Sequence, residues 1–362
     1  MTRRDSGRGG HLGSRLLPLT VASLAVIATA CAQEADLADV TADVTTGDVD
    51  FEATPEFVSD AAERSTGEPY RLEMTLAMDL DFAGESFDFD APMMSGEQDG
   101  ELSHIRMDMG PLMKEIGRLA PPGEAFTPEG SDADLTMEIV ADRQVMYLRA
   151  PMYEALADMP GGGQLGPMGD LAALGDAWGR VDLAELGDVL PLNDVASAAG
   201  GQAADPRALL ELVAGTDDVD ELGDAEVRGV PVQGLAAQVT LGELLEASGL
   251  SAEEFMRSLG RSQPAEAEAF MESLTDAPMA LEAWIDDDGY VRRMGYEFDL
   301  LAALAGVLPD RDRDGGLSGF TYGISMDFFD YGDDSIAIEF PDPDEAVDVT
   351  DSFLELYAGP AT

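Results

Sequence analysis

Histidine and cysteine are nearly absent from this chain of 362 residues, which contains one cysteine, Cys31, and two histidines, His11 and His104. A disulfide within the chain is excluded because it needs two thiols. Ser-His-Asp and Cys-His centres need a histidine base, and the sequence has neither a Gly-x-Ser-x-Gly motif nor a His and Cys cluster for zinc. We therefore expect a protein that is not an enzyme, in which His104 is an ordinary solvent-facing residue.

Positive charge is also scarce. The chain has 20 Lys and Arg against 73 Asp and Glu, and its formal net charge is -53. This charge would repel nucleic acid and anionic lipid surfaces, so we expect no nucleic-acid partner and no electrostatic attachment to a membrane. Because the acidic residues are spread along the whole chain, they indicate a solvated surface.

The N-terminus has the pattern of an export signal. Four arginines precede an uncharged apolar run, residues 16–30, which is shorter than the roughly 20 residues of a membrane-spanning helix. The run ends Ile27-Ala28-Thr29-Ala30-Cys31, and small residues before a cysteine resemble the bacterial lipobox. We predict a lipoprotein signal peptide at residues 1–30 and lipidation of Cys31, which would anchor the chain to the outer face of the cell membrane. Cleavage would remove four Arg and one Asp, so the net charge would fall from -53 to -56.

Two regions follow the predicted signal peptide. Residues 31–54 are acidic and lack periodicity, which predicts a tether that starts at the lipidated cysteine. Residues 55–362 have enough apolar content for a core, and we predict that they form a single domain.

Alternation of apolar and polar residues predicts a β-sheet. The longest such run extends from Tyr70 to Phe82, and shorter ones cover residues 105–109, 135–139, 235–241, 281–285, 294–300, 320–328 and 336–340. One apolar face per run predicts an antiparallel sheet with its other face towards water. Between two of the runs, Asp286-Asp287-Asp288-Gly289 predicts a tight hairpin.

Helix signals occur mostly between the predicted strands. Asp205 and Gly215 delimit one helix, Ser251 and Glu254 form a capping box for a second at 251–259, and Pro264 opens a third that ends near Leu274. This order predicts an α+β fold with helices on one face of the sheet. Residues 110–130 and 155–200 are interpreted as insertions or lids.

One segment matches the start of a calcium-binding loop. Asp310, Asp312 and Asp314 occupy positions 1, 3 and 5, and Gly315 occupies position 6. Position 12 is Thr321, which cannot supply the bidentate carboxylate of such loops. A structural calcium site and a plain polar turn both remain open, and we expect no other cofactor.

The 18 methionines recur in or beside the apolar faces of different predicted strands. Methionine is flexible and polarisable, and adaptable binding surfaces are rich in it, but it also fills ordinary cores. If these faces enclose a cavity, the residues expected to line it are Leu72, Met74, Leu76, Met78, Met107, Met137, Met294, Tyr296, Phe298, Ile324 and Met326.

Three segments resemble the actinobacterial LppX/LprG-type lipoproteins, which are similar in fold to the LolA and LolB carriers. They are residues 226–241 (EVRGVPV to VTL), residues 283–294 (AWIDDDGYVRRM) and residues 328–341 (FFDYGD to IAIEFP). The resemblance implies a curved antiparallel half-barrel with helices packed across its concave face and an apolar cavity for acyl chains. The histidine or tyrosine usual after the first segment's Val-Pro is replaced by Gln233-Gly234-Leu235.

Two functions are compatible with these observations. The first is a lipid-anchored carrier or chaperone that binds a lipid or another hydrophobic ligand in an apolar cavity. The second is an envelope sensor or interaction module that has a protein partner and no small-molecule ligand. A large continuous cavity would favour the carrier, and a filled core with an exposed apolar patch would favour the module.

Overall fold

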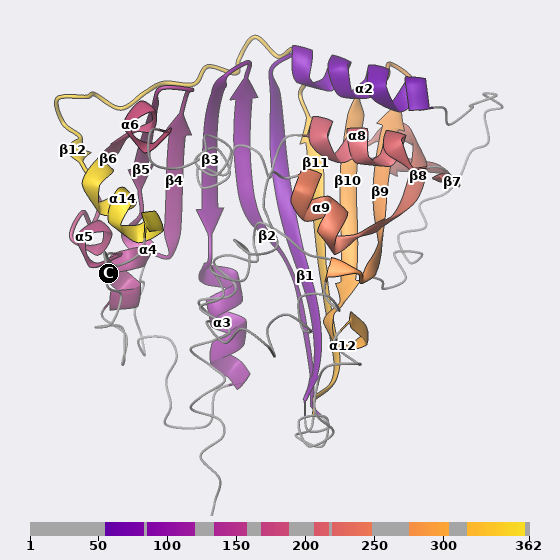
Figure 1. Cartoon of the computed structure of the whole chain (residues 1–362), viewed down its shortest axis with the longest axis horizontal. Helices are drawn as coiled ribbons and strands as arrows, with labels where there is room; N and C mark the ends of the chain where they lie inside the picture. The colour runs from indigo at the N-terminus through magenta and orange to yellow at the C-terminus, as the bar shows by residue number, and fades with distance from the viewer. Residues whose placement is uncertain are drawn as a thin grey trace, which may run out of the picture.

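The computed structural model describes residues 55–82, 85–119, 134–157, 168–187, 206–216, 219–247, 275–303 and 317–358. Their strands form one 12-stranded sheet with the order β12-β6-β5-β4-β3-β2-β1-β11-β10-β9-β8-β7. Neighbouring strands are antiparallel except for the parallel pair of β12 and β6. Because β12 and β7 are separate edges, the sheet is open, and it forms the curved half-barrel of the predicted α+β class (Figure 1).

Long strands form the centre of the sheet. Strand β1 (Tyr70–Phe82) covers the same residues as the longest alternating run, and it pairs with β2 (Glu85–Asp99) and β11 (Leu317–Phe329). Beyond β11 the sheet continues through β10 (Val291–Asp299), β9 (Pro278–Asp286), β8 (Val230–Thr240) and the edge strand β7 (Val219–Val227).

Shorter strands complete the sheet on the other side of β2. They are β3 (Leu102–Asp108), β4 (Thr136–Ala141), β5 (Val145–Arg149), β6 (Gly179–Asp182) and β12 (Val347–Asp348). The last is a pair of residues close to the C-terminus, so the chain returns from the middle of the sheet to its far edge.

The helices lie mainly against one face, which we call the inner face, and the opposite face is the outer face (Figure 1). Helices α2 (Pro55–Gly67), α8 (Pro206–Gly215) and α9 (Leu241–Ala247) pack together beside β8–β11, and α12 (Leu300–Ala303) follows β10. Helix α3 (Gly110–Leu119) follows β3. Four short helices gather near β4–β6: α4 (Pro151–Ala157), α5 (Met168–Ala172), α6 (Leu183–Gly187) and α14 (Thr350–Ala358). Among the helices that the structure describes, none has the length and apolar character needed to cross a membrane.

Apolar side chains of the inner face form two clusters. The main cluster joins β1, β2 and β8–β11 to α2, α8 and α9, and it includes fully buried Phe298, Phe328 and Leu235. The smaller cluster joins β4–β6 to α4, α5, α6 and α14, around Met146 and Leu148. Half-buried Met109 packs against both clusters, so β3 and the start of α3 mark the seam between them.

The predicted hairpin connects β9 and β10, which confirms that prediction. Gly289 has a φ of 80°, and Oδ1 of buried Asp286 accepts hydrogen bonds from the backbone N–H groups of Asp288 and Tyr290. Oδ2 of Asp286 accepts a bond from Nε of Arg292 at 2.5 Å. The aspartate therefore closes the turn and binds the first part of the next strand.

The run at 336–340 was expected to be a strand, and this prediction is wrong. Residues 330–346, which we call the strap, cross the strand ends of the outer face without joining the sheet, and lead from β11 to β12 (Figure 1). Arg71 on β1 binds Asp330 and Asp333 of the strap at 2.8 and 3.4 Å, and Phe340 packs edge-on against Tyr147 of β5. The alternation at 336–340 arises because an extended chain lays alternate side chains on the sheet.

The interpretation of residues 155–200 as an insertion or lid is wrong for residues 179–182, whereas that of residues 110–130 stays a prediction for the described part, 110–119. Residues 110–119 form α3, whose Leu112 and Met113 are buried in the two clusters. Strand β6 belongs to the main sheet, and its Val181 is fully buried. The helix predicted after Asp205 is confirmed as α8, whereas the helices predicted at 251–259 and 264–274 lie outside the described residues.

Candidate functional site

A row of methionines crosses the inner face of the sheet. Six strands that are adjacent in the sheet each place one methionine directly opposite the next: Met137 (β4), Met107 (β3), Met94 (β2), Met74 (β1), Met326 (β11) and Met294 (β10). Directly opposite residues in antiparallel strands have Cβ atoms about 4.5–5.5 Å apart. The row therefore forms a continuous stripe of thioether side chains.

A bulge in β2 adds a further methionine to this stripe. The register between β1 and β2 shifts between Met74 and Thr75, because Met94 pairs with Met74 while Pro92 pairs with Thr75. Met93 is the unpaired extra residue, and both Met93 and Met94 are buried. Bulges re-aim side chains in this way, and here two consecutive methionines are buried together.

Burial along the row decreases from the main cluster towards the seam. Met294 is 0% exposed and Met74 is 4% exposed, whereas Met107 and Met137 are only half-buried. The methionines of β10 and β11 therefore fill a closed core, and those of β3 and β4 border the place where the two clusters meet.

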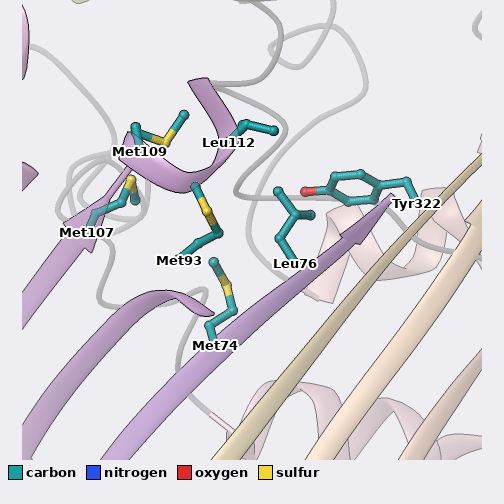
Figure 2. Close-up of a pocket in the computed structure, with 7 residues that line it drawn as sticks. All are labelled: Met74, Leu76, Met93, Met107, Met109, Leu112 and Tyr322. Carbon is teal, nitrogen blue, oxygen red and sulfur yellow. The ribbon is translucent and has the colours of Figure 1, made fainter. Parts of the chain in front are cut away.

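A small hollow lies at the seam, between the sheet and α3. Figure 2 shows its lining, which consists of Met74, Leu76, Met93, Met107, Met109, Leu112 and Tyr322. The lining is almost entirely apolar, and the volume is about 10 Å³. A water molecule needs about 10–15 Å³ and two to four polar partners, so the hollow is about the size of one water molecule and its apolar lining offers such a molecule few partners.

Local hydrogen bonds fix α3 above the hollow. The backbone N–H of Met109 donates to the carbonyl of Leu135 at 3.0 Å, and Oδ1 of Asp108 accepts a bond from the N–H of Gly110 at 2.8 Å. Helix α3 then buries Leu112 in the main cluster and Met113 in the smaller one. Its first turn therefore closes the seam.

The structure brings three of the eleven residues expected to line a cavity into the hollow, namely Met74, Leu76 and Met107. Seven others are buried in the main cluster: Leu72, Met78, Met294, Tyr296, Phe298, Ile324 and Met326. Met137 is half-buried and packs against the smaller cluster. The lining also includes Met93, Met109, Leu112 and Tyr322, which the sequence analysis did not select.

Several other predicted features lie outside the described residues. These are Cys31, the tether, and the aspartates of the calcium-like loop, Asp310, Asp312 and Asp314. Within the described ranges, no group of three or more His, Cys, Asp or Glu side chains is placed to hold a metal ion. The signal peptide, the lipid anchor and the calcium site stay predictions.

The outer face carries several ion pairs. Arg228, in the turn between β7 and β8, reaches Glu73 on β1 and Asp327 on β11, and Arg293 also binds Asp327, at 2.6 Å. His104 is half-exposed, with its Nε2 2.9 Å from Oε1 of Glu138. These contacts give His104 a structural role within the outer face.

No protein-family model and no curated protein matches this sequence. The fold is similar to that of solved lipoproteins: LprF from Mycobacterium bovis (TM-score 0.33, 11% identity, 79% of this chain and 96% of that one) and LppX from Mycobacterium tuberculosis (0.30, 8%, 79% and 97%). It is also similar to a putative outer membrane lipoprotein-sorting protein domain from Vibrio parahaemolyticus (0.21, 10%, 78% and 94%). These are the lipoprotein types that the three sequence segments resemble. All three TM-scores lie below 0.5.

Proposed function

We propose that the mature protein is an envelope lipoprotein that binds a lipid-like hydrophobic ligand at the methionine seam and carries it. Cys31 would be acylated and would hold the domain to the outer face of the cell membrane, with residues 31–54 as the tether. The observation that carries the proposal is the hollow itself, which is lined by flexible apolar side chains where two packed clusters meet.

Ligand entry requires α3 to move. A site for a lipid-sized molecule needs roughly 300–1,000 Å³, whereas the hollow measures about 10 Å³. Displacement of the first turn of α3 would uncover Leu76 and Met93 on the sheet and separate the two clusters. Half-buried Met107 and Met109 stand at the seam, where a ligand would first make contact.

The alternative, an interaction module without a ligand, would use an exposed apolar patch. The large apolar side chains that are exposed in the described part of the chain are Leu222 and Val347. They belong to β7 and β12, the opposite edges of the sheet, and so do not form one patch. The described part of the chain therefore has no single exposed apolar patch for a partner, and the carrier proposal rests on the hollow at the seam.

Native mass spectrometry tests ligand binding. Residues 32–362 are purified and offered a diacylglycerol and a triacylglycerol, and we expect about one lipid per chain. Met107→Trp, which fills the seam, should abolish uptake, whereas Arg106→Trp, at the exposed neighbouring position on the other face of β3, should not. A folded wild-type chain that stays empty with both lipids would refute the carrier function.

The anchor needs its own experiment. Wild-type chain expressed in a bacterium that makes lipoproteins should partition into detergent, and its N-terminal peptide should have the mass of acylated Cys31. Two or more acyl chains are needed for stable attachment, because each buried CH₂ contributes only about 0.8 kcal/mol. Cys31→Ser should abolish the acyl mass. An unmodified cysteine in the membrane-associated wild type would contradict the lipid anchor.

A further inference from the structure

The lining of the hollow is rich in methionine. Of its seven lining residues four are methionines, two are leucines and one is Tyr322. The methionines come from three different strands and from the residue before α3: Met74 (β1), Met93 (β2), Met107 (β3) and Met109. The lining therefore presents several thioether sulfurs and no carboxylate or imidazole.

Thioether sulfur is a soft ligand. Among biological metal ions such ligands select Cu(I), whereas divalent ions such as Mg²⁺ and Ca²⁺ prefer oxygen and Zn²⁺ prefers imidazole and thiolate. A cation in an apolar site loses its hydration, and this cost rises with charge, so a monovalent ion is favoured over a divalent one. The volume of the hollow, about 10 Å³, suits a single ion and excludes a larger ligand while α3 is closed.

Two features of the fold would assist such a site. Cross-strand register and the bulge at Met93 bring the methionines of β1, β2 and β3 to one place, and flexible methionine side chains can turn their sulfurs towards a common ion. Figure 2 shows the side chains of Met74, Met93, Met107 and Met109 converging between the sheet and the first turn of α3. The formal charge of -53 also raises the concentration of cations around the protein.

We propose that this hollow is a binding site for a soft monovalent metal ion, Cu(I), held by sulfur atoms of Met74, Met93, Met107 and Met109. The metal site does not rest on lipid carriage: it uses the closed position of α3, whereas lipid uptake needs the open one, so bound Cu(I) and lipid would compete. Bound Cu(I) would thus stabilise the closed seam.

The test uses the full-length chain with Cys31→Ser, so that no thiol competes for the metal. Cu(I) is supplied anaerobically with ascorbate and a competing bicinchoninate chelator, and we expect one Cu(I) per chain. The triple variant Met93→Leu/Met107→Leu/Met109→Leu should lower the affinity by more than about 100-fold, beyond the usual cost of an outer-shell change. Methionine to leucine exchange conserves volume and usually costs less than about 1.5 kcal/mol per site, and thermal unfolding checks that the variant is folded.

The matched control is Met78→Leu/Met294→Leu/Met326→Leu, which removes three buried methionines that do not line the hollow and should leave Cu(I) affinity unchanged. Ag(I), which has the same softness and no redox chemistry here, is titrated into the Cys31→Ser chain with ¹³C-methyl methionine. The NMR signals of Met74, Met93, Met107 and Met109 should shift and those of the control methionines should not. Absence of one-to-one binding, an equal loss in both triple variants, or shifts confined to other methionines would overturn the metal site.

Offering the Cys31→Ser chain lipid and Ag(I) in separate samples distinguishes the two proposals. Lipid uptake without Ag(I) binding would overturn the metal site and leave the carrier function standing. Ag(I) binding without lipid uptake would support the metal site and refute the carrier.

Discussion

Gly234 on β8 provides space for an aromatic ring on the outer face. A Cβ atom at this position would lie 2.7 Å from two ring carbons of Trp284, which is closer than nonbonded carbons approach. The ring of Trp284, on the paired strand β9, therefore lies directly over Gly234. Position 234 belongs to the Gln-Gly-Leu segment that departs from the lipoprotein pattern, and the structure gives a local reason for its glycine.

Gly234→Ala should lower the free energy of unfolding by about 1–3 kcal/mol, because the rigid indole must leave its place. Denaturant unfolding measures the change. Gly295→Ala is the matched control: it is also a buried strand glycine, but a Cβ there would meet only one carbonyl oxygen, at 3.5 Å. Equal losses in both variants would mean that the Trp284 ring accommodates the methyl group.

Asp79, near the C-terminal end of β1, lies close to other negative charges. It lies directly opposite Asp88 of β2, and burial together with the negative charges of Asp88 and Asp81 raises the pKa of Asp79. A raised pKa in the folded state means that folding favours the protonated carboxyl. The stability from this protonation is present at low pH and is lost as the pH rises through the raised pKa of Asp79.

Asp79→Asn should therefore stabilise the protein at pH 7, by about 0.2–1 kcal/mol, the usual size of a cross-strand charge effect. The gain should shrink as the pH falls and the wild-type carboxyl becomes protonated. Unfolding curves at several pH values provide the measurement. Asp88→Asn should relieve the same repulsion, so the double variant should gain less than the two single gains together. A gain that is independent of pH would point to another cause.

At the scale of elements, the strap fastens the far edge of the sheet. It carries the chain from β11 across the outer face to β12 and α14, and its Phe340 packs on Tyr147 with ring centroids 5.8 Å apart at an interplanar angle of 75°. Edge-to-face aromatic pairs contribute about 0.5–1.5 kcal/mol beyond burial of their area. The strap thus covers an apolar side chain that the sheet alone would expose.

A double-mutant cycle on Phe340→Ala and Tyr147→Ala should give a coupling energy of about 0.5–1.5 kcal/mol. The control cycle combines Phe340→Ala with Tyr331→Phe, at the β11 end of the strap, and should be additive within about 0.5 kcal/mol. Chemical unfolding of the four variants in each cycle supplies the energies. Additivity of the Phe340 and Tyr147 changes would show that the strap is not held by this ring pair.

Alternation in the sequence predicted those strands that bury one face and are polar on the other. β1 is the clearest example, since Leu72, Met74, Leu76 and Met78 are buried on one side. The same signal failed at 336–340 because alternation reports an extended chain with one buried face, and not hydrogen bonding to a neighbour. The edge strand β7 was missed for the opposite reason: six of its nine residues are exposed and four are acidic, so it has no apolar face to detect.

The hollow could be predicted only in part. Met74, Leu76 and Met107 were selected from their strand patterns, but the row of methionines depends on register between strands that are distant in the sequence. Met93 enters the lining through a bulge, for which the sequence offers only the preceding Pro92 as a hint. Helix α3 did have a signal, Asp108 followed by Pro111 at the first turn, which is a common helix start.

At the scale of the whole molecule, one sheet joins two apolar clusters. The main cluster has long strands and three packed helices, and the smaller one is built from short strands and short helices. Because the clusters meet at β3 and α3, a displacement of α3 can separate the two clusters while the central strands stay paired. The seam is therefore the place where we expect this fold to open.

Net charge opposes folding of the whole molecule. A formal charge of -53 creates self-repulsion that is strongest when the chain is compact. Raising NaCl from 0.01 to 1 M shortens the screening length from about 30 to about 3 Å, so the midpoint of thermal unfolding should rise steadily over this range. A midpoint that does not respond to NaCl would refute the role of self-repulsion.

Calcium chloride at the same ionic strength as NaCl, with EDTA-treated protein as the reference, separates screening from specific calcium binding. An additional rise with Ca²⁺ that Asp312→Asn abolishes would support the predicted loop at Asp310, Asp312 and Asp314. Equal effects of calcium chloride and NaCl on the unfolding midpoint would argue against that loop.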